Sequence, residues 1–186
     1  MIEQEQRTKI HLGCGKRNFG PDWIHIDGSN YPHVDSNNIR RLLYEDNSMD
    51  LLYASHVIAY FDRQEIVNVL TEWRRVLKPN GILRLATPDF RTMIRLYNEH
   101  NIPLQSFVGP LYGRMQMGNE TIYHKTCYDK EDLTSLLLSV GFDNVREWDW
   151  RDVEHGIHDD HSQAYIPHMD KDNGTLISLN IECNKQ

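Results

Sequence analysis

The chain has 186 residues, of which 39% are hydrophobic and 25% charged, and its formal net charge is -7. This length suits a single domain, and the composition supports a packed core. The excess of carboxylates disfavours a nucleic-acid partner, because nucleic-acid binding draws its affinity mainly from Lys and Arg contacts to phosphates. No apolar run approaches the ~20 residues of a membrane span. We therefore expect a cytoplasmic protein without a membrane partner.

The N-terminus and the cysteines give little indication of function. The N-terminus is polar and lacks the basic and apolar regions of a secretory signal, so we expect residues 1–8 to be flexible and residues 9–186 to form one domain. Cys14, Cys127 and Cys183 are far apart and show no CxxC spacing. This pattern predicts free thiols, with neither a disulfide framework nor a cysteine-rich zinc site.

The first half of the chain predicts strands separated by turns. Residues 9–12 and 23–27 alternate apolar and polar side chains, residues 39–43 form a weaker third candidate, and residues 50–55 are typical of a buried strand. Residues 62–77 carry apolar side chains at helical spacing, with Asp62 as N-cap and Glu65 as its capping-box partner. The helix ends before the Pro and Gly of residues 78–81.

A strand at residues 82–87 follows, and strand, helix and strand together imply a parallel right-handed crossover. A second helix is expected from residue 88 or 89 to about residue 100, and a third over residues 129–140, ending at Gly141. Between them, residues 101–125 are rich in Pro and Gly and predict an irregular insertion that serves as a lid or binding loop. Strands at residues 145–150 and 175–183 complete the sheet.

The turn after the first strand, Gly13-Cys14-Gly15, is the first candidate for a ligand site. In doubly wound sheets the ligand lies beyond the carboxyl ends of the strands, beside this turn. A dinucleotide site would need a third glycine, where this chain has Asn18, and a helix N-terminus facing the pyrophosphate. Residues 16–22 leave no room for that helix. S-adenosylmethionine has no phosphates and needs only close backbone approach and a carboxylate for its ribose, which Asp27 supplies.

Four motifs in order carry a resemblance: residues 10–15 (IHLGCG), 23–27 (WIHID), 45–56 (EDNSMDLLYASH) and 72–81 (EWRRVLKPNG). Together they resemble the class I S-adenosylmethionine-dependent methyltransferases, and in particular the small subgroup whose first helix is reduced to a loop. The match spans residues 9–150. It implies a three-layer Rossmann-like α/β fold with a mostly parallel seven-stranded sheet, whose last strand at residues 175–183 is antiparallel.

The resemblance also implies a set of site residues. Gly13 and Gly15 would approach the methionyl part of the cofactor, Asp27 the ribose, and Asn38 with Ile39 the adenine. Relatives often carry Asp at the position of Asn38. The full cofactor-binding set would be Gly13, Cys14, Gly15, Asp27, Gly28, Asn38, Ile39 and Ser55.

Methyl transfer chiefly requires alignment of the acceptor with the methyl carbon. An oxygen acceptor also needs a base near neutral pH, and His is the natural choice. His56, which would lie with Ser55 between cofactor and acceptor, is the first candidate and His124 the second; a purely packing role for His56 is the alternative. Relatives often carry His where this chain has Tyr60.

Two further segments bear on the acceptor. The Asp/Asn-Pro-Pro-aromatic motif of enzymes that methylate amino groups is replaced by residues 55–58 (SHVI), which disfavours that chemistry. Residues 151–174 contain several His and Asp side chains and predict a polar loop over the active-site mouth; a metal site there is the less favoured alternative, and we expect no metal.

The sequence therefore predicts an S-adenosylmethionine-dependent methyltransferase that modifies a small-molecule or sugar acceptor at an oxygen atom. A catalytically silent domain that binds S-adenosylmethionine or serves interactions would show the same motifs, and turnover distinguishes the two. An NAD-binding oxidoreductase fragment is disfavoured by the missing third glycine and first helix, and competition by NAD would test it.

Overall fold

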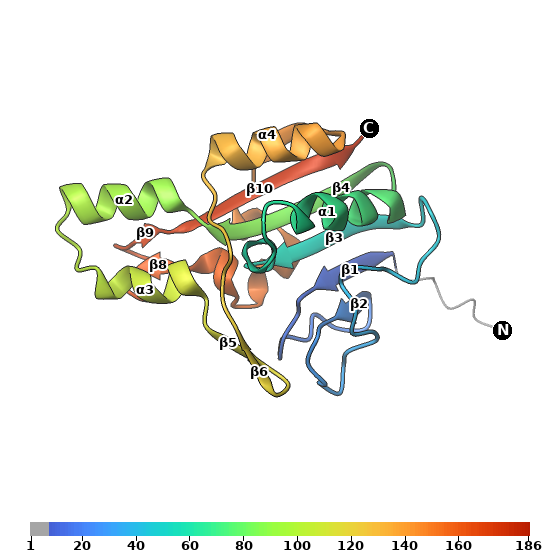
Figure 1. The fold of residues 1–186 in the computed structure, drawn as a ribbon, viewed down its shortest axis with the longest axis horizontal. Coiled ribbons are helices and arrows are strands. Elements are labelled where there is room, and N and C mark those ends of the chain that lie inside the picture. The colour runs from blue at the N-terminus through green and yellow to red at the C-terminus, as the bar shows by residue number, and fades with distance from the viewer. Residues whose placement is uncertain (1–7) are drawn as a thin grey trace.

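A six-stranded sheet forms the centre of the computed structural model, which describes residues 8–186 (Figure 1). Residues 1–7, most of the segment expected to be flexible, lie outside the described residues. The strand order is β2-β1-β3-β4-β10-β7, with β1 parallel to β2 and β3, β3 parallel to β4, and β10 antiparallel to β4 and β7. The α/β class and the antiparallel last strand are confirmed. The strands are β1 (Lys9–Leu12), β2 (Trp23–Ile26), β3 (Met49–Ser55), β4 (Leu77–Pro88), β7 (Phe142–Glu147) and β10 (Ser178–Lys185).

One face of the sheet is apolar and lies under two helices. α1 (Glu65–Val76) and α4 (Lys130–Val140) bury their apolar sides in the same core as the strand residues that point toward them. The predicted capping box precedes α1: Asp62 Oδ1 accepts from the amide of Glu65, and Glu65 Oε2 accepts from the amide of Asp62. Gly141 ends α4 with a φ of 94°, as expected.

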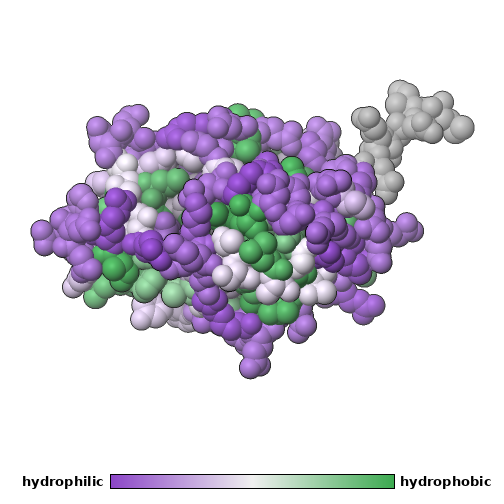
Figure 2. Space-filling view, turned by 90° about the horizontal axis from the view of Figure 1, so that it is seen from above, coloured by the Kyte–Doolittle hydropathy of each residue, from purple (hydrophilic) through white to green (hydrophobic). Residues whose placement is uncertain are grey.

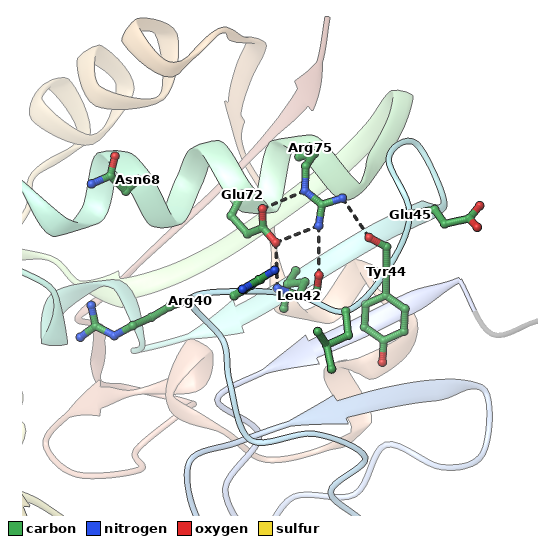
Figure 3. Close-up of a pocket in the computed structure, with 9 residues that line it drawn as sticks. Arg40, Leu42, Tyr44, Glu45, Asn68, Glu72 and Arg75 are labelled. Atoms are coloured by element: carbon green, nitrogen blue, oxygen red, sulfur yellow. Dashed lines mark hydrogen bonds and ion pairs between the residues drawn. The ribbon is translucent and has the colours of Figure 1, made fainter.

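The prediction of a third strand at residues 39–43 is wrong, so the sheet has six strands and not the expected seven. Side chains take up the backbone groups that such a strand would pair. Asn38 Oδ1 accepts from the amides of residues 40 and 41, and Glu72 Oε1 accepts from the amide of Leu42. Arg75 Nη2 donates to Leu42 O, and Trp73 Nε1 donates to Ile39 O. Figure 3 shows the resulting groove between this loop and α1, with Glu72 and Arg75 reaching across it. The segment is thus fastened to a helix instead of joining the sheet.

The opposite face of the sheet is polar and aromatic, and short turns cover it in place of helices. The covering elements are the 3-10 turns η2 (Trp150–Asp152), η3 (Glu154–Ile157) and η4 (His161–Gln163). Arg84 and Glu182 form an ion pair of 2.8 Å on this face, and Tyr53 OH donates to Asp160 Oδ2 at 2.5 Å. Residues 150–163 therefore form the third layer of the expected three-layer fold. The polar side chains that this layer buries need hydrogen-bonding partners.

The expectation of an irregular insertion at residues 101–125 is wrong. This region contains α3 (Gln105–Tyr112) and a hairpin of β5 (Met115–Met117) and β6 (Glu120–Ile122). α3 packs with α2 (Phe90–Glu99) and with the small ladder of β8 (Tyr165–Ile166) and β9 (Thr175–Leu176). The glycines that predicted irregular structure instead end α3 at Gly113 and turn the hairpin at Gly118, both with positive φ.

The strand predicted at residues 145–150 lies three residues earlier, at β7. Trp148 follows β7; its amide still donates to Asn180 O, its Nε1 donates to Leu85 O, and its ring packs on the polar and aromatic face of the sheet. Within residues 8–186, no helix is long and apolar enough to cross a membrane. Figure 2 shows that hydrophilic side chains cover most of the face seen from above, with separate hydrophobic patches between them.

Candidate functional site

The sheet register places three predicted site residues side by side at its carboxyl edge. Leu12 of β1 pairs with Ile26 of β2 and with Ala54 of β3. The residues that follow them, Gly13, Asp27 and Ser55, therefore share this edge. This is where ligands bind in open α/β sheets.

The turn after β1 is shaped for close approach of a ligand. Gly13 and Gly15 have φ values of 65° and 55°, a region that other residues rarely adopt. A Cβ at Gly13 would overlap the side chain of Val57, whereas the space in front of Gly15 is open. Asp27 is buried below the turn, where its Oδ2 accepts from the amide of Gly15 at 2.8 Å and its Oδ1 from the amide of Ser29 at 2.7 Å.

These residues fit the nucleoside and methionyl parts of S-adenosylmethionine. Each Asp27 oxygen keeps a further lone pair, as ribose hydroxyls require. Ser55 Oγ is buried and lacks a hydrogen-bond partner among the described residues, which is unusual for a buried hydroxyl and suits a polar ligand. The donors, the acceptors and the open space at Gly15 thus agree with such a ligand.

The other predicted cofactor-binding residues differ in burial and in the contacts that they make. Burial raises the pKa of the Cys14 thiol to about 12, so this side chain is a neutral packing group. A Cβ at Gly28 would lie 2.7 Å from Sδ of Met117, so the β5–β6 hairpin packs closely against the loop after β2. Asn38 is exposed, with its Oδ1 turned onto the following backbone, and Ile39 is partly buried against the main core.

His56 follows β3 at the same edge, with a φ of 55°. Its Nε2 lies 3.3 Å from Ser178 Oγ of β10, and its ring lies 5.1 Å from that of His161. Burial, reinforced by His161, His124 and Arg17, holds the pKa of His56 well below its usual value. The imidazole is therefore neutral at physiological pH and can accept a proton.

His124 is less available for proton transfer. Its Nδ1 donates to Pro110 O at 3.1 Å, and its Nε2 is buried against Gly113 without a partner in the described part of the chain. Tyr60, which stands where relatives carry His, donates its hydroxyl hydrogen to Gly113 O at 2.5 Å and packs edge-on against His124. Both side chains hold the end of α3 in place.

The histidines of residues 151–174 do not gather into one cluster. His155 and His158 stack near Phe19 on the polar face of the sheet, while His161 reaches His56. Across residues 8–186, no group of three His, Cys, Asp or Glu side chains could hold a metal ion.

Three residues near His56 were missed by the sequence argument. Ser178 and Asn180 lie on the polar side of β10, and Arg17 lies in the loop after β1, where its Nε donates to Asp159 O at 2.8 Å. The alternation of Ser178, Asn180 and Glu182 with apolar neighbours was the available signal, since a strand with two buried faces is expected to be apolar throughout.

Comparison with known proteins agrees with this arrangement. Residues 12–85, which contain the turn, Asp27 and His56, match the family described as "Methyltransferase domain". The match covers less than half of the chain and marks this segment as similar to methyltransferase domains. The cofactor of this family is S-adenosylmethionine. A relative from Aspergillus luteorubrus, named probable methyltransferase ltbC, is 41% identical over 56 residues, which cover 30% of this chain and 19% of that protein. The matched part is thus about a fifth of the relative's length.

Solved structures share the fold of this chain. A SAM-dependent methyltransferase from Methanosarcina mazei superimposes with a TM-score of 0.59 at 17% identity, covering 97% of this chain and 93% of that one. One from Archaeoglobus fulgidus gives a TM-score of 0.57 at 15% identity, covering 96% and 86%. A structure of a Haloferax volcanii complex with the Trm112 methyltransferase activator gives 0.53 at 13% identity, covering 96% and 81%.

Proposed function

We propose that this chain transfers a methyl group from S-adenosylmethionine to an oxygen atom of a small-molecule or sugar acceptor. The observation that carries the proposal is the meeting, at one edge of the sheet, of the glycine turn, the buried Asp27 carboxylate and the neutral imidazole of His56. Bound S-adenosylmethionine would supply a methyl group activated as a sulfonium. The chain then has to position the acceptor and receive its proton.

On the cofactor side, the backbone of Gly13 and Gly15 would lie against the methionyl part, and Asp27 would accept hydrogen bonds from the ribose hydroxyls. The bond from the Gly15 amide to Asp27 fixes the carboxylate and the turn relative to each other. We assign the ribose contact to Asp27 because a carboxylate with spare lone pairs matches two adjacent hydroxyls.

On the acceptor side, we assign the base to His56. The pKa of this side chain is lowered chiefly by burial, so the imidazole is unprotonated at neutral pH. A hydroxyl acceptor would pass its proton to His56 as its oxygen attacks the methyl carbon. Such general-base assistance contributes typically ~10²–10⁴-fold to a rate. The chain's negative charge supports an acceptor other than a nucleic acid.

Calorimetric titration with S-adenosylmethionine and S-adenosylhomocysteine tests the cofactor site. We expect Asp27→Asn to weaken binding of both ligands at least tenfold, about 1.4 kcal/mol. Asp22→Asn, in the loop before β2, is the matched control and should bind as the wild type does. Absence of binding by folded wild-type protein would refute the proposal.

Transfer of a labelled methyl group to hydroxylated acceptors, sugars first, tests the reaction. His56→Gln should lower the turnover number by about 10²-fold or more while leaving S-adenosylhomocysteine affinity unchanged. Firm cofactor binding without turnover on any acceptor would instead indicate a catalytically silent binding domain.

A further inference from the structure

A buried chain of hydrogen bonds leads from His56 to the segment that covers the polar face of the sheet. His56 Nε2 lies 3.3 Å from Ser178 Oγ, Ser178 Oγ lies 2.9 Å from Asn180 Oδ1, and Asn180 Nδ2 lies 3.0 Å from Ser162 O. Ser178, Asn180 and Ser162 are 6%, 5% and 2% exposed, so water does not compete for these bonds. Each partner's chemistry therefore determines the direction of the bond.

The direction of each hydrogen bond can be assigned in turn, starting at Ser162. Ser162 O is a backbone carbonyl and only accepts, so the Asn180 amide must turn its NH₂ group toward it. Asn180 Oδ1 then faces Ser178 and only accepts, so the Ser178 hydroxyl donates its one hydrogen to it. The lone pairs of Ser178 Oγ remain for His56. A hydrogen on Nε2 of His56 satisfies this contact, and a bare Nε2 would set two lone pairs against each other.

We propose that Ser178 and Asn180 are positioning residues that fix His56 as the Nε2–H tautomer and leave Nδ1 as the nitrogen that takes the acceptor's proton. This inference rests on the proposed function for its catalytic meaning. Among the described residues nothing pairs with His56 Nδ1. The ring is half-buried between Ser178 and the ring of His161, which limits its rotation.

The covering segment, residues 150–163, anchors the hydrogen-bond chain at Ser162, the end away from His56. Asp160 Oδ1 accepts from the amide of Ser162 at 2.7 Å, and Asp160 Oδ2 accepts from Tyr53 OH at 2.5 Å. Ser162 O is thereby held in place beneath the sheet. The orientation of His56 therefore depends on residues 160–162, over a hundred positions away in the sequence.

Two variants shift the tautomer in different ways. Asn180→Ala removes the acceptor of the Ser178 hydroxyl, which can then rotate and donate to His56 Nε2, so the Nδ1–H tautomer should become populated. Ser178→Ala removes the partner of Nε2–H, and the ring should lose its single fixed state, whereas Ser178→Thr keeps the hydroxyl and should restore it. Asn184→Ala, on the same strand near its exposed end, is the matched control.

The measurement is long-range ¹H–¹⁵N correlation of the imidazole nitrogens in the ¹⁵N-labelled, ligand-free protein at neutral pH, with His56→Gln to assign the signals. We expect wild-type His56 to show a protonated Nε2 and an unprotonated Nδ1. A protonated Nδ1 in the wild type, or an unchanged tautomer in both Asn180→Ala and Ser178→Ala, would overturn the inference.

Kinetics add a second readout where turnover is found. Ser178→Ala and Asn180→Ala should lower kcat about tenfold with little change in KM, and Ser178→Thr should recover it. Because the tautomer is measured without cofactor or acceptor, a correct tautomer in a protein that transfers no methyl group would refute the proposed function and not the hydrogen-bond assignment.

Discussion

His155 should make the stability of the protein depend on pH. The side chain is 3% exposed, its ring lies 4.1 Å from that of Tyr53, and its Nε2 lies 3.3 Å from Arg84 Nη1. Burial, and then the Arg84 guanidinium, lower its pKa from 6.5 to about 3. The unfolded chain therefore binds one more proton at His155 than the folded chain does between these two pH values.

This difference in bound protons sets the sign and size of the change in unfolding free energy with pH. Where the unfolded state binds more protons, the free energy of unfolding rises with pH, so stability is full above pH 6.5 and falls as the pH drops toward 3. One proton corresponds to about 1.4 kcal/mol per pH unit. Lowering the pH from 6.5 to 4 should therefore cost about 3 kcal/mol through His155 alone.

Urea denaturation of wild type and His155→Gln at a series of pH values tests this. The variant loses packing at every pH, so the decisive quantity is the slope of unfolding free energy against pH between 4 and 6. We expect the slope to be about 1.4 kcal/mol per pH unit smaller in His155→Gln than in the wild type. His100→Gln, on the exposed end of α2, is the control and should keep the wild-type slope. Equal slopes in wild type and His155→Gln would refute the reasoning.

Two further predictions concern the cofactor turn and the base. Gly13→Ala should lower the free energy of unfolding by about 2–4 kcal/mol, because Gly13 has a positive φ and a Cβ there would overlap Val57. Gly15→Ala should lower it by about 1–2 kcal/mol, from the positive φ alone. Equal losses in urea denaturation would contradict the role of Val57. Arg17→Gln should move the acidic limb of the kcat/KM profile to higher pH, because the cation helps to lower the pKa of His56, and an unmoved limb would contradict this.

The sequence predicts the parts of the fold whose signals are local. The capping box of Asp62 and Glu65, the helix end at Gly141 and the alternation of β1 and β2 each depend on a few neighbouring residues, and all appear as expected. The absence of a helix between β1 and β2 follows from loop length alone. Local chemistry thus suffices for the framework on which the cofactor turn is built.

The incorrect predictions arise where side chains distant in the sequence determine the local structure. Residues 39–43 have the composition of a weak strand, but Glu72 and Arg75 bind their backbone groups across some thirty positions. Gly113 and Gly118 predict irregular structure by composition, although a left-handed glycine is equally the end of a helix or the corner of a hairpin. In the candidate site, His56 could be placed from its strand. Its partner Ser178, and Asn180 beyond it, could not, because the sequence does not reveal the register in which β10 pairs with β4.

The covering segment explains why the candidate site and the fold cannot be separated in this small chain. A mostly parallel sheet is buried on both faces, and here residues 150–163 replace helices on one of them. Because 3-10 turns offer little apolar surface, the polar face is closed by specific bonds such as those of Asp160, Ser162 and Asn180. The same bonds end at His56. A contact that closes the core therefore also orients the proposed base, so loosening the cover would disorder the base before it exposed the apolar core under α1 and α4.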